Sequence, residues 1–156
     1  MTPLRSKVHC EIAALLAVFF LGGCASLAPP VQRVDQITPE GSGDTEIEQN
    51  VRELLADAKD ESAAVYLQNG VDAFAARLAA VERSSRSVDA QYYLFHNDIT
   101  GNLFAERLLT AAQRGIQVRL LLDDMGTQGQ DDYLLALDAH SNIDIRIFNP
   151  FANRKY

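Results

Sequence analysis

The chain has 156 residues, of which 47% are hydrophobic, and its formal net charge is −7. This length supports one folded domain but not comfortably two. The acidic excess is concentrated in residues 24–70, which hold three basic and nine acidic residues. Because a nucleic-acid-binding surface needs a basic excess, the composition argues against nucleic acid as a partner.

The first 23 residues have the pattern of a leader. Arg5 and Lys7 form a short positive region, and an uninterrupted apolar run follows over residues 12–21. This run is too short for a membrane-spanning helix, which needs roughly 20 apolar residues. Small residues come directly after it. We therefore predict a cleavable signal peptide of the lipoprotein type over residues 1–23.

Cys24 is the expected lipid attachment site. The Leu-Gly-Gly-Cys of residues 21–24 resembles a lipobox, the site where bacteria attach diacylglycerol to the cysteine and cleave before it. We expect an exported lipoprotein, anchored to a membrane on the periplasmic side, and Ala25 favours the outer membrane over the inner one. The alternative is a chance cysteine beside small residues. The other cysteine, Cys10, lies inside the predicted leader, so we expect no disulfide framework.

Two segments are predicted between the leader and the folded part. Residues 24–44 contain several prolines and a Gly-Ser-Gly, a composition typical of a flexible tether. Thr45 and Glu48 have the spacing of a capping box, and apolar residues recur after them with a helical period. Residues 45–63 are therefore predicted to form an amphipathic helix, over about residues 45–58, and a connection.

The remaining residues, 64–156, alternate between helical and strand patterns. We predict helices over about residues 72–83, 103–114 and 131–140, and strands over residues 87–95, 117–122 and 143–148. The first of these strands is apolar on both faces, as a central strand requires. Residues 97–102 read as a polar turn. This order predicts an α/β fold, a mostly parallel sheet with flanking helices and right-handed crossovers.

Polar residues follow the predicted strands at the edge where such sheets bind ligands. They are His96 and Asp98 after the first strand, Asp123 and Asp124 after the second, and Asn149 after the third. Each also fits a structural role, because Asp and Asn start turns by bonding to their own backbone. Both interpretations stay open on the sequence alone.

A metal centre is not expected. The adjacent carboxylates of Asp123 and Asp124 are the kind of pair that binds a divalent cation. That site would also require a third carboxylate and a lysine at other strand ends. Asp98 is available, but Lys155 is the only lysine after residue 70. The chain also has no nucleophile elbow, phosphate-binding loop or paired-cysteine zinc motif.

Several blocks of the folded part resemble a known family when they are taken together. They are residues 71–78, 87–98 with Thr100-Gly101, 114–126 and 149–151. In this order they resemble the opening of the phospholipase D superfamily, closest to its bacterial cardiolipin synthase branch. The resemblance covers about residues 64–151 and implies an incomplete first half of a phospholipase D-type fold.

The resemblance implies phosphatidyl transfer through a phosphohistidine. In that family two similar halves each supply a His-x-Lys-x4-Asp motif. One histidine attacks phosphorus, the other protonates the leaving alcohol, and the lysines neutralise the phosphoryl oxygens. The implied partners are a membrane and a phospholipid of the phosphatidylglycerol type. The scheme needs no metal and no other cofactor.

No His-x-Lys occurs in this sequence. The three histidines are followed by other residues two positions on: His9 by Glu11, His96 by Asp98, and His140 by Asn142. We therefore assign no catalytic residue to this chain and offer His96, Asp98, Asp123 and Asp124 only as substrate-rim candidates.

The expected function follows from the resemblance and from this departure. We expect the N-terminal part of a membrane-anchored phosphatidyltransferase, inactive by itself, which needs the missing C-terminal half. Without that half, apolar surface that it would cover is exposed, and we therefore expect marginal stability or aggregation. The alternatives are a non-catalytic lipoprotein module for binding or scaffolding, and a fragment of a phospholipase D-family nuclease, which the acidic balance disfavours.

Overall fold

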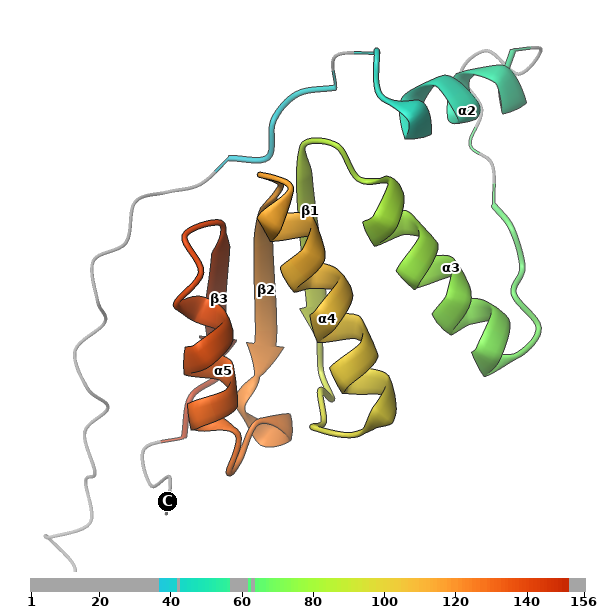
Figure 1. Ribbon diagram of the computed structural model, residues 1–156. Coiled ribbons are helices and arrows are strands. Elements are labelled where there is room, and N and C mark those ends of the chain that lie inside the picture. The colour runs from blue at the N-terminus through green and yellow to red at the C-terminus, as the bar shows by residue number, and fades with distance from the viewer. Residues whose placement is uncertain (1–36, 42, 57–61, 63, 152–156) are drawn as a thin grey trace, which may run out of the picture. The chain divides into compact units, whose positions relative to one another are not determined.

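The computed structural model describes residues 37–41, 43–56, 62 and 64–151 (Figure 1). The predicted signal peptide, Cys24 and most of the predicted tether lie outside these residues, and so do Lys155 and the end of the chain. Among the residues that are described, no helix has both the length and the apolar character needed to cross a bilayer.

The described chain consists of helices and three strands. In chain order the elements are α2 (Glu46–Leu54), α3 (Gly70–Arg83), β1 (Ser87–Tyr92), α4 (Ile99–Gln113), β2 (Gln117–Asp123), the 3-10 turn η1 (Asp124–Gly126), α5 (Asp131–Asp138) and β3 (Ile143–Phe148). The strands form one sheet in the order β1-β2-β3, and both pairs are parallel. The predicted α/β fold with a parallel sheet is confirmed.

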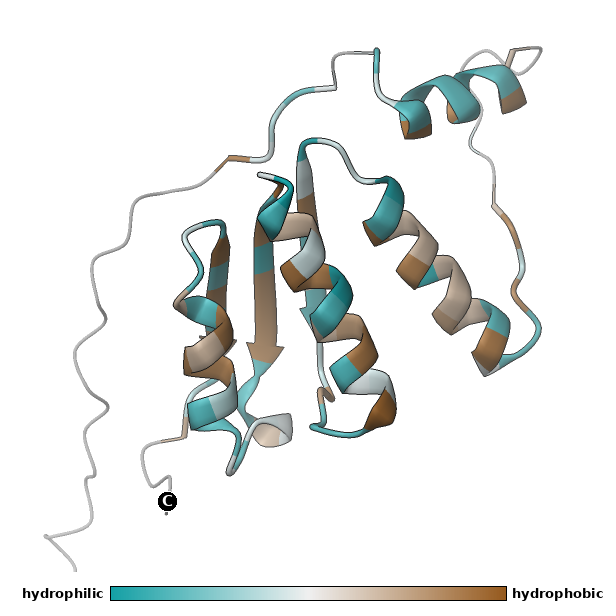
Figure 2. Ribbon diagram, in the orientation of Figure 1, coloured by the Kyte–Doolittle hydropathy of each residue, from teal (hydrophilic) through white to brown (hydrophobic). Residues whose placement is uncertain are grey.

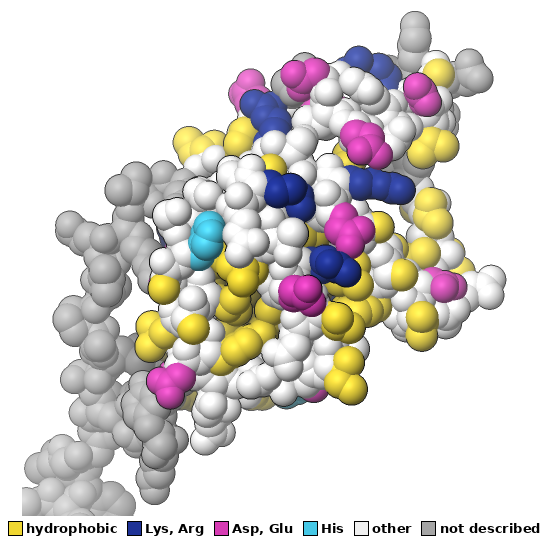
Figure 3. All heavy atoms as spheres, in the orientation of Figure 1, with side chains coloured by type: hydrophobic (Ala, Val, Ile, Leu, Met, Phe, Trp, Pro, Cys, Tyr) yellow, Lys and Arg dark blue, Asp and Glu magenta, His cyan; other side chains and the backbone are white. Residues whose placement is uncertain are grey.

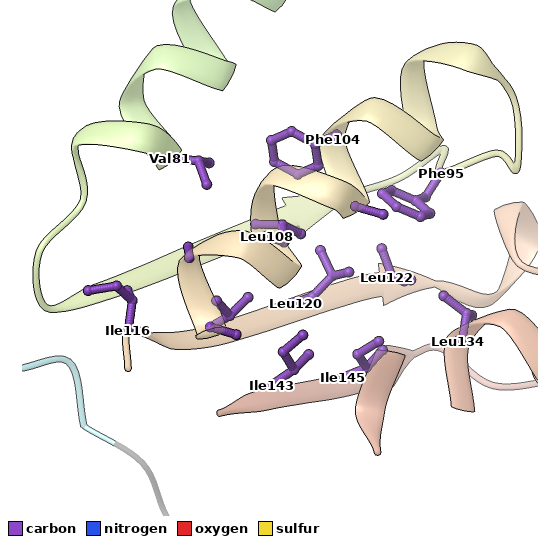
Figure 4. Packing of buried hydrophobic residues seen from close by; sticks show 14 residues of the cluster. Val81, Phe95, Phe104, Leu108, Ile116, Leu120, Leu122, Leu134, Ile143 and Ile145 are labelled. Atoms are coloured by element: carbon purple, nitrogen blue, oxygen red, sulfur yellow. The ribbon is translucent and has the colours of Figure 1, made fainter. Parts of the chain in front are cut away.

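One face of the sheet carries the hydrophobic core. Helices α4 and α5 connect successive parallel strands and lie on this face (Figure 1), as crossovers of one hand require. Figure 4 shows side chains from both helices meeting those of β2 and β3 between the layers. The buried residues of this cluster are Val81, Phe95, Phe104, Ala105, Leu108, Ala111, Ala112, Ile116, Val118, Leu120, Leu122, Leu134, Ile143 and Ile145.

The opposite face of the sheet is polar. Side chains alternate along each strand, so the residues between the buried ones project from this face. A cavity of about 460 Å³ lies here, and the charged residues that line it are Asp89, Arg119, Asp144 and Arg146. The prediction that the first strand is apolar on both faces is therefore wrong, because Asp89 and Gln91 are exposed on its second face.

Several predicted boundaries also differ from the structure, and two of them lie next to the site described below. Strand β1 ends at Tyr92 rather than at residue 95. Helix α4 begins at Ile99, inside the segment predicted as a turn, because the Asp98 side chain caps it by accepting a hydrogen bond from the Gly101 backbone N–H. Helix α2 has the capping box predicted from Thr45 and Glu48. Figure 2 shows that α2 is mainly hydrophilic, whereas α4 carries a hydrophobic side.

Candidate functional site

The carboxyl ends of the three strands lie at one edge of the sheet. Tyr92, the last residue of β1, pairs in register with Leu122, and Asp123 of β2 pairs with Phe148 of β3. The segments that follow these residues therefore leave the sheet at the same end. The sequence prediction placed the polar residues of interest in these segments, so the topology brings them to one region of the molecule.

The loops after β1 and β2 pack directly against each other. The backbone of Gly126 lies so close to Tyr93 that a Cβ at position 126 would come 2.9 Å from the Tyr93 carbonyl oxygen. The side-chain amide of Gln130 donates hydrogen bonds to the carbonyl oxygens of Phe95, at 2.9 Å, and Gly126, at 2.8 Å. Tyr93 also donates from its hydroxyl to the Met125 sulfur at 3.0 Å. These contacts hold the two loops together.

Asp98 acts as the N-cap of α4. Its Oδ1 accepts hydrogen bonds from the Gly101 backbone N–H and from the Thr100 hydroxyl, both at 2.8 Å. These hydrogen bonds lower the pKa of the Asp98 carboxyl, with the Gly101 N–H as the largest cause. The Oδ1 atom of Asp98 is thus already used to start the helix. The geometry therefore supports a structural role for Asp98, as the cap of α4.

Asp123 and Asp124 do not form a paired site. The Asp123 Oδ1 accepts a hydrogen bond from the Met125 backbone N–H at 2.9 Å and caps η1. Asp124 is only 2% exposed, and its Oδ1 accepts from the Thr127 hydroxyl at 3.1 Å. The Asp124 side chain therefore lies beneath the surface and not on the rim. Within the described part of the chain, no three His, Cys, Asp or Glu side chains are grouped as metal ligands would be.

His96 lines a small cavity between the amino ends of α3 and α4. The cavity has a volume of about 280 Å³ and is shared by residues of both helices and the β1 loop, among them Arg77, His96, Asp98 and Thr100. Gly101 is required here, because a Cβ at this position would overlap the His96 carbonyl oxygen. The start of α4 therefore fixes the backbone of His96, whose imidazole is exposed.

Arg77 is the cationic residue of this cavity that the sequence prediction missed. Its guanidinium lies over the ring of Phe74, 5.8 Å from the centroid, and 6.0 Å from that of Tyr92. Tyr92 in turn packs against the rings of Phe95 and Phe104. The aromatic group thus holds the cation at the cavity wall. The i, i+3 spacing of Phe74 and Arg77 on a helix was the available signal.

The cavity suits an anionic group of modest size. The side chains of Arg77 and His96 both carry N–H groups that can donate hydrogen bonds to phosphate oxygens. Asp98 adds a negative charge, which opposes a strongly charged anion.

Asn149, the last predicted polar residue of this edge, is exposed and adopts a left-handed backbone conformation with φ of 53°. It ends β3 and is not part of the cavity lining.

Several proteins of known sequence resemble the chain. Cardiolipin synthase C of Escherichia coli is 49% identical over 88 residues, which cover 56% of this chain and 19% of that protein. A cardiolipin synthase of Oceanobacillus iheyensis is 30% identical over 95 residues, 56% of this chain and 20% of the relative. An uncharacterized protein of Helicobacter pylori is 36% identical over 143 residues, 87% of this chain and 27% of the relative. No protein-family model matches the sequence.

The chain therefore spans only about a fifth to a quarter of the length of these relatives. The similarity to cardiolipin synthases, together with a parallel α/β sheet built from the blocks identified in the sequence, confirms the resemblance. This chain is related to the bacterial cardiolipin synthases of the phospholipase D type.

Proposed function

We propose that this chain acts as the amino-terminal part of a membrane-anchored phosphatidyltransferase of the cardiolipin synthase type. The observation that carries the proposal is the 49% identity over 88 residues with cardiolipin synthase C of Escherichia coli. An identity of this size over more than half of the chain goes with a common substrate class, here phospholipids. The cavity beside Arg77 and His96 supplies a cation and an imidazole for a phosphate headgroup at the carboxyl edge of the sheet.

The chain alone is proposed to be inactive. Attack on a phosphodiester phosphorus requires an imidazole nucleophile, and the negative charge that develops on phosphate requires a neighbouring cation. The His-x-Lys pair that provides both in this family does not occur in the sequence, and His96 is followed by Asn97 and Asp98. The role of these residues is then to bind and position the substrate, and the chemistry is supplied by a segment that carries the His-x-Lys motif.

Membrane attachment is proposed to occur through a lipid on Cys24. A lipid-anchored enzyme meets lipid substrates at a high local concentration, which raises the probability of encounter without new contacts. Two or more acyl chains on one cysteine make the attachment long-lived, because each buried methylene contributes roughly 0.8 kcal/mol.

The anchor is tested by fractionating cells that express the full chain or its cysteine variants. We expect Cys24→Ser to release the protein from membranes and to remove the acyl mass from the N-terminal peptide. Cys10→Ser is the matched control and should leave both unchanged. Membrane retention of Cys24→Ser would contradict the proposed anchor.

The proposed lipid binding and inactivity are tested on vesicles that contain phosphatidylglycerol. The full chain should release neither cardiolipin nor phosphatidic acid, and formation of either would contradict the proposed inactivity. Arg77→Met should weaken the binding of soluble glycerophosphate to the cavity. Binding is measured from the shifts of the His96 NMR resonances during titration. Arg52→Met, which removes an exposed arginine from α2, is the control. Equal headgroup binding by the two variants would contradict the proposed role of the cavity.

A non-catalytic lipoprotein module is the second candidate. The observation that favours it is that Asp98, Asp123 and Asp124 all serve local structure and not an open site. In this case the wild-type chain does not bind glycerophosphate in the cavity, whereas membrane attachment through Cys24 persists.

A further inference from the structure

The polar face of the sheet already holds a segment of the chain itself. The hydroxyl of Thr38 donates to the Asp89 Oδ2 at 3.2 Å and accepts from an Arg119 Nη atom at 2.6 Å. Thr38 is therefore bound by both members of an ion pair that bridges β1 and β2. These contacts join residues more than 50 positions apart in the sequence.

A second contact holds the same segment two residues later. The Arg86 guanidinium, just before β1, donates to the Glu40 carbonyl oxygen at 2.8 Å. Ile37 and Pro39 line a cavity of about 230 Å³ together with Arg119 and the first residues of β1 and β2. The segment thus crosses the amino-terminal end of the sheet and is bound through its backbone as well as through Thr38.

The part of the binding site that contacts Thr38 is formed by two strands of the sheet. Arg119 donates from Nε to one carboxylate oxygen of Asp89 and from Nη to the other, in the two-pronged geometry that fixes a guanidinium plane. The Arg119 side chain is only 18% exposed, compared with 44% for Asp89. The ion pair therefore presents a preformed hydrogen-bond donor and acceptor to the Thr38 hydroxyl.

A further pair of hydrogen bonds determines how the segment leaves the sheet. The Glu48 carboxylate of α2 accepts from the backbone N–H groups of Gly43 and Thr45, both at 3.1 Å. These hydrogen bonds fix the turn that leads into α2. Arg83 of α3 forms an ion pair with Glu46 of α2 at 3.6 Å.

We propose that residues 37–41 form a docked strap, and that the Asp89–Arg119 pair with Arg86 is its binding site. The strap determines the point at which the N-terminal tether leaves the folded part. With the Cys24 anchor of the proposed function, the stretch between anchor and strap is residues 24–36, whose fully extended length is at most roughly 45 Å. A tether that is free through residue 44 would span roughly 70 Å, at about 3.3–3.6 Å per residue. Docking therefore shortens the distance that the folded part can reach from the membrane.

The strap is tested by cleavage of the full chain with a glutamate-specific protease. The bond after Glu40 is followed by mass spectrometry and compared among the wild type, Thr38→Val and Arg86→Met. Thr38→Val keeps the shape of the side chain and removes the hydroxyl. We expect cleavage of this bond to be about three- to tenfold faster in each variant, because cleavage follows the population of the undocked state.

Thr110→Val is the matched control, since it removes an exposed hydroxyl that bonds only within α4. It should leave cleavage after Glu40 unchanged. Equal cleavage rates in the wild type, Thr38→Val and Arg86→Met would overturn the strap. The readout does not depend on lipid attachment, so the same assay on Cys24→Ser separates the two proposals. Protection of Glu40 that persists in Cys24→Ser supports the strap even if the anchor fails.

Discussion

The two faces of the same three strands are stabilised in different ways. On the helix-covered face, aliphatic side chains of β2 and β3 are buried beneath α4 and α5, and Leu122 is fully buried. On the opposite face, the same strands carry an ion pair between Asp89 and Arg119 and a second one between Asp144 and Arg146. Figure 3 views the molecule from the helix side, where hydrophobic side chains gather between the helices. The comparison shows that the sequence of a parallel strand can predict burial on both faces although only one face of the sheet contributes to the core.

The largest expected effect separates two neighbours in β2 that project to opposite faces. Leu122→Ala should lower the free energy of unfolding by about 2–5 kcal/mol, because it removes a fully buried side chain and leaves a cavity. Leu121→Ala, on the open face, should cost about 1 kcal/mol or less. Urea denaturation monitored by circular dichroism measures both. Equal losses would show that the open face is buried by something else in solution.

The next effect concerns the start of α4, the helix that covers the core. Gly101→Ala should cost about 1–3 kcal/mol, because the new Cβ overlaps the His96 carbonyl and forces the loop to move. Gly70→Ala at the start of α3 meets open space and should instead stabilise by about 0.4–1 kcal/mol. Thermal unfolding of the two variants should therefore shift in opposite directions. A shared direction would contradict the close approach at His96.

A smaller effect should follow from the cap of the same helix. Asp98→Ala removes the acceptor for the Gly101 N–H and should lower the melting temperature by roughly 2–5 °C. Asp98→Asn keeps an oxygen acceptor and should retain most of the stability. Because folding lowers the pKa of Asp98 below its ordinary value of 3.8, the contribution is present at neutral pH and is lost as the pH falls through the lowered pKa. A pH-independent difference between wild type and Asp98→Asn would argue against a charged cap.

The smallest effect is expected on the open face. Asp89→Asn should cost at most about 1 kcal/mol, since the Asp89 side chain is exposed and salt screens the pair. The Arg119 hydrogen bond lowers the pKa of Asp89, so this contribution too is present above the ordinary pKa and disappears in acid. A double-mutant cycle with Arg119→Met at low and high salt isolates the pair. A coupling that salt does not reduce would indicate that more than the strap covers this face in solution.

The sequence was sufficient to predict the order and parallel arrangement of the elements. Continuous apolar runs bounded by glycine and polar turns located β2 and β3 to within a residue. The start of α4 was missed because Ile99, Thr100 and Gly101 are weak helix formers. The side chain of Asp98 outweighs that weakness by capping the helix, and an aspartate just before an apolar periodic segment was the usable signal.

The site was only partly predictable. Topology places His96 and Asp98 beside the segment with Asp123 and Asp124, but sequence spacing cannot tell which carboxylates point inward. Asp124 is buried by its contact with Thr127, and that orientation depends on the packing of two loops. The contact of Thr38 with Asp89 joins segments too distant for any local pattern. No periodicity in residues 37–41 signals it.

The strand order has a consequence for how the domain is assembled. Each strand pairs with the one that precedes it in the chain, Val88 with Val118 and then Val118 with Ile143, through a single intervening helix. Every ladder can close as soon as its own βαβ unit has emerged, without waiting for a distant partner. Such sequential closure allows stepwise folding in the direction of synthesis. The sheet can thus be built one strand at a time as the chain emerges from the ribosome.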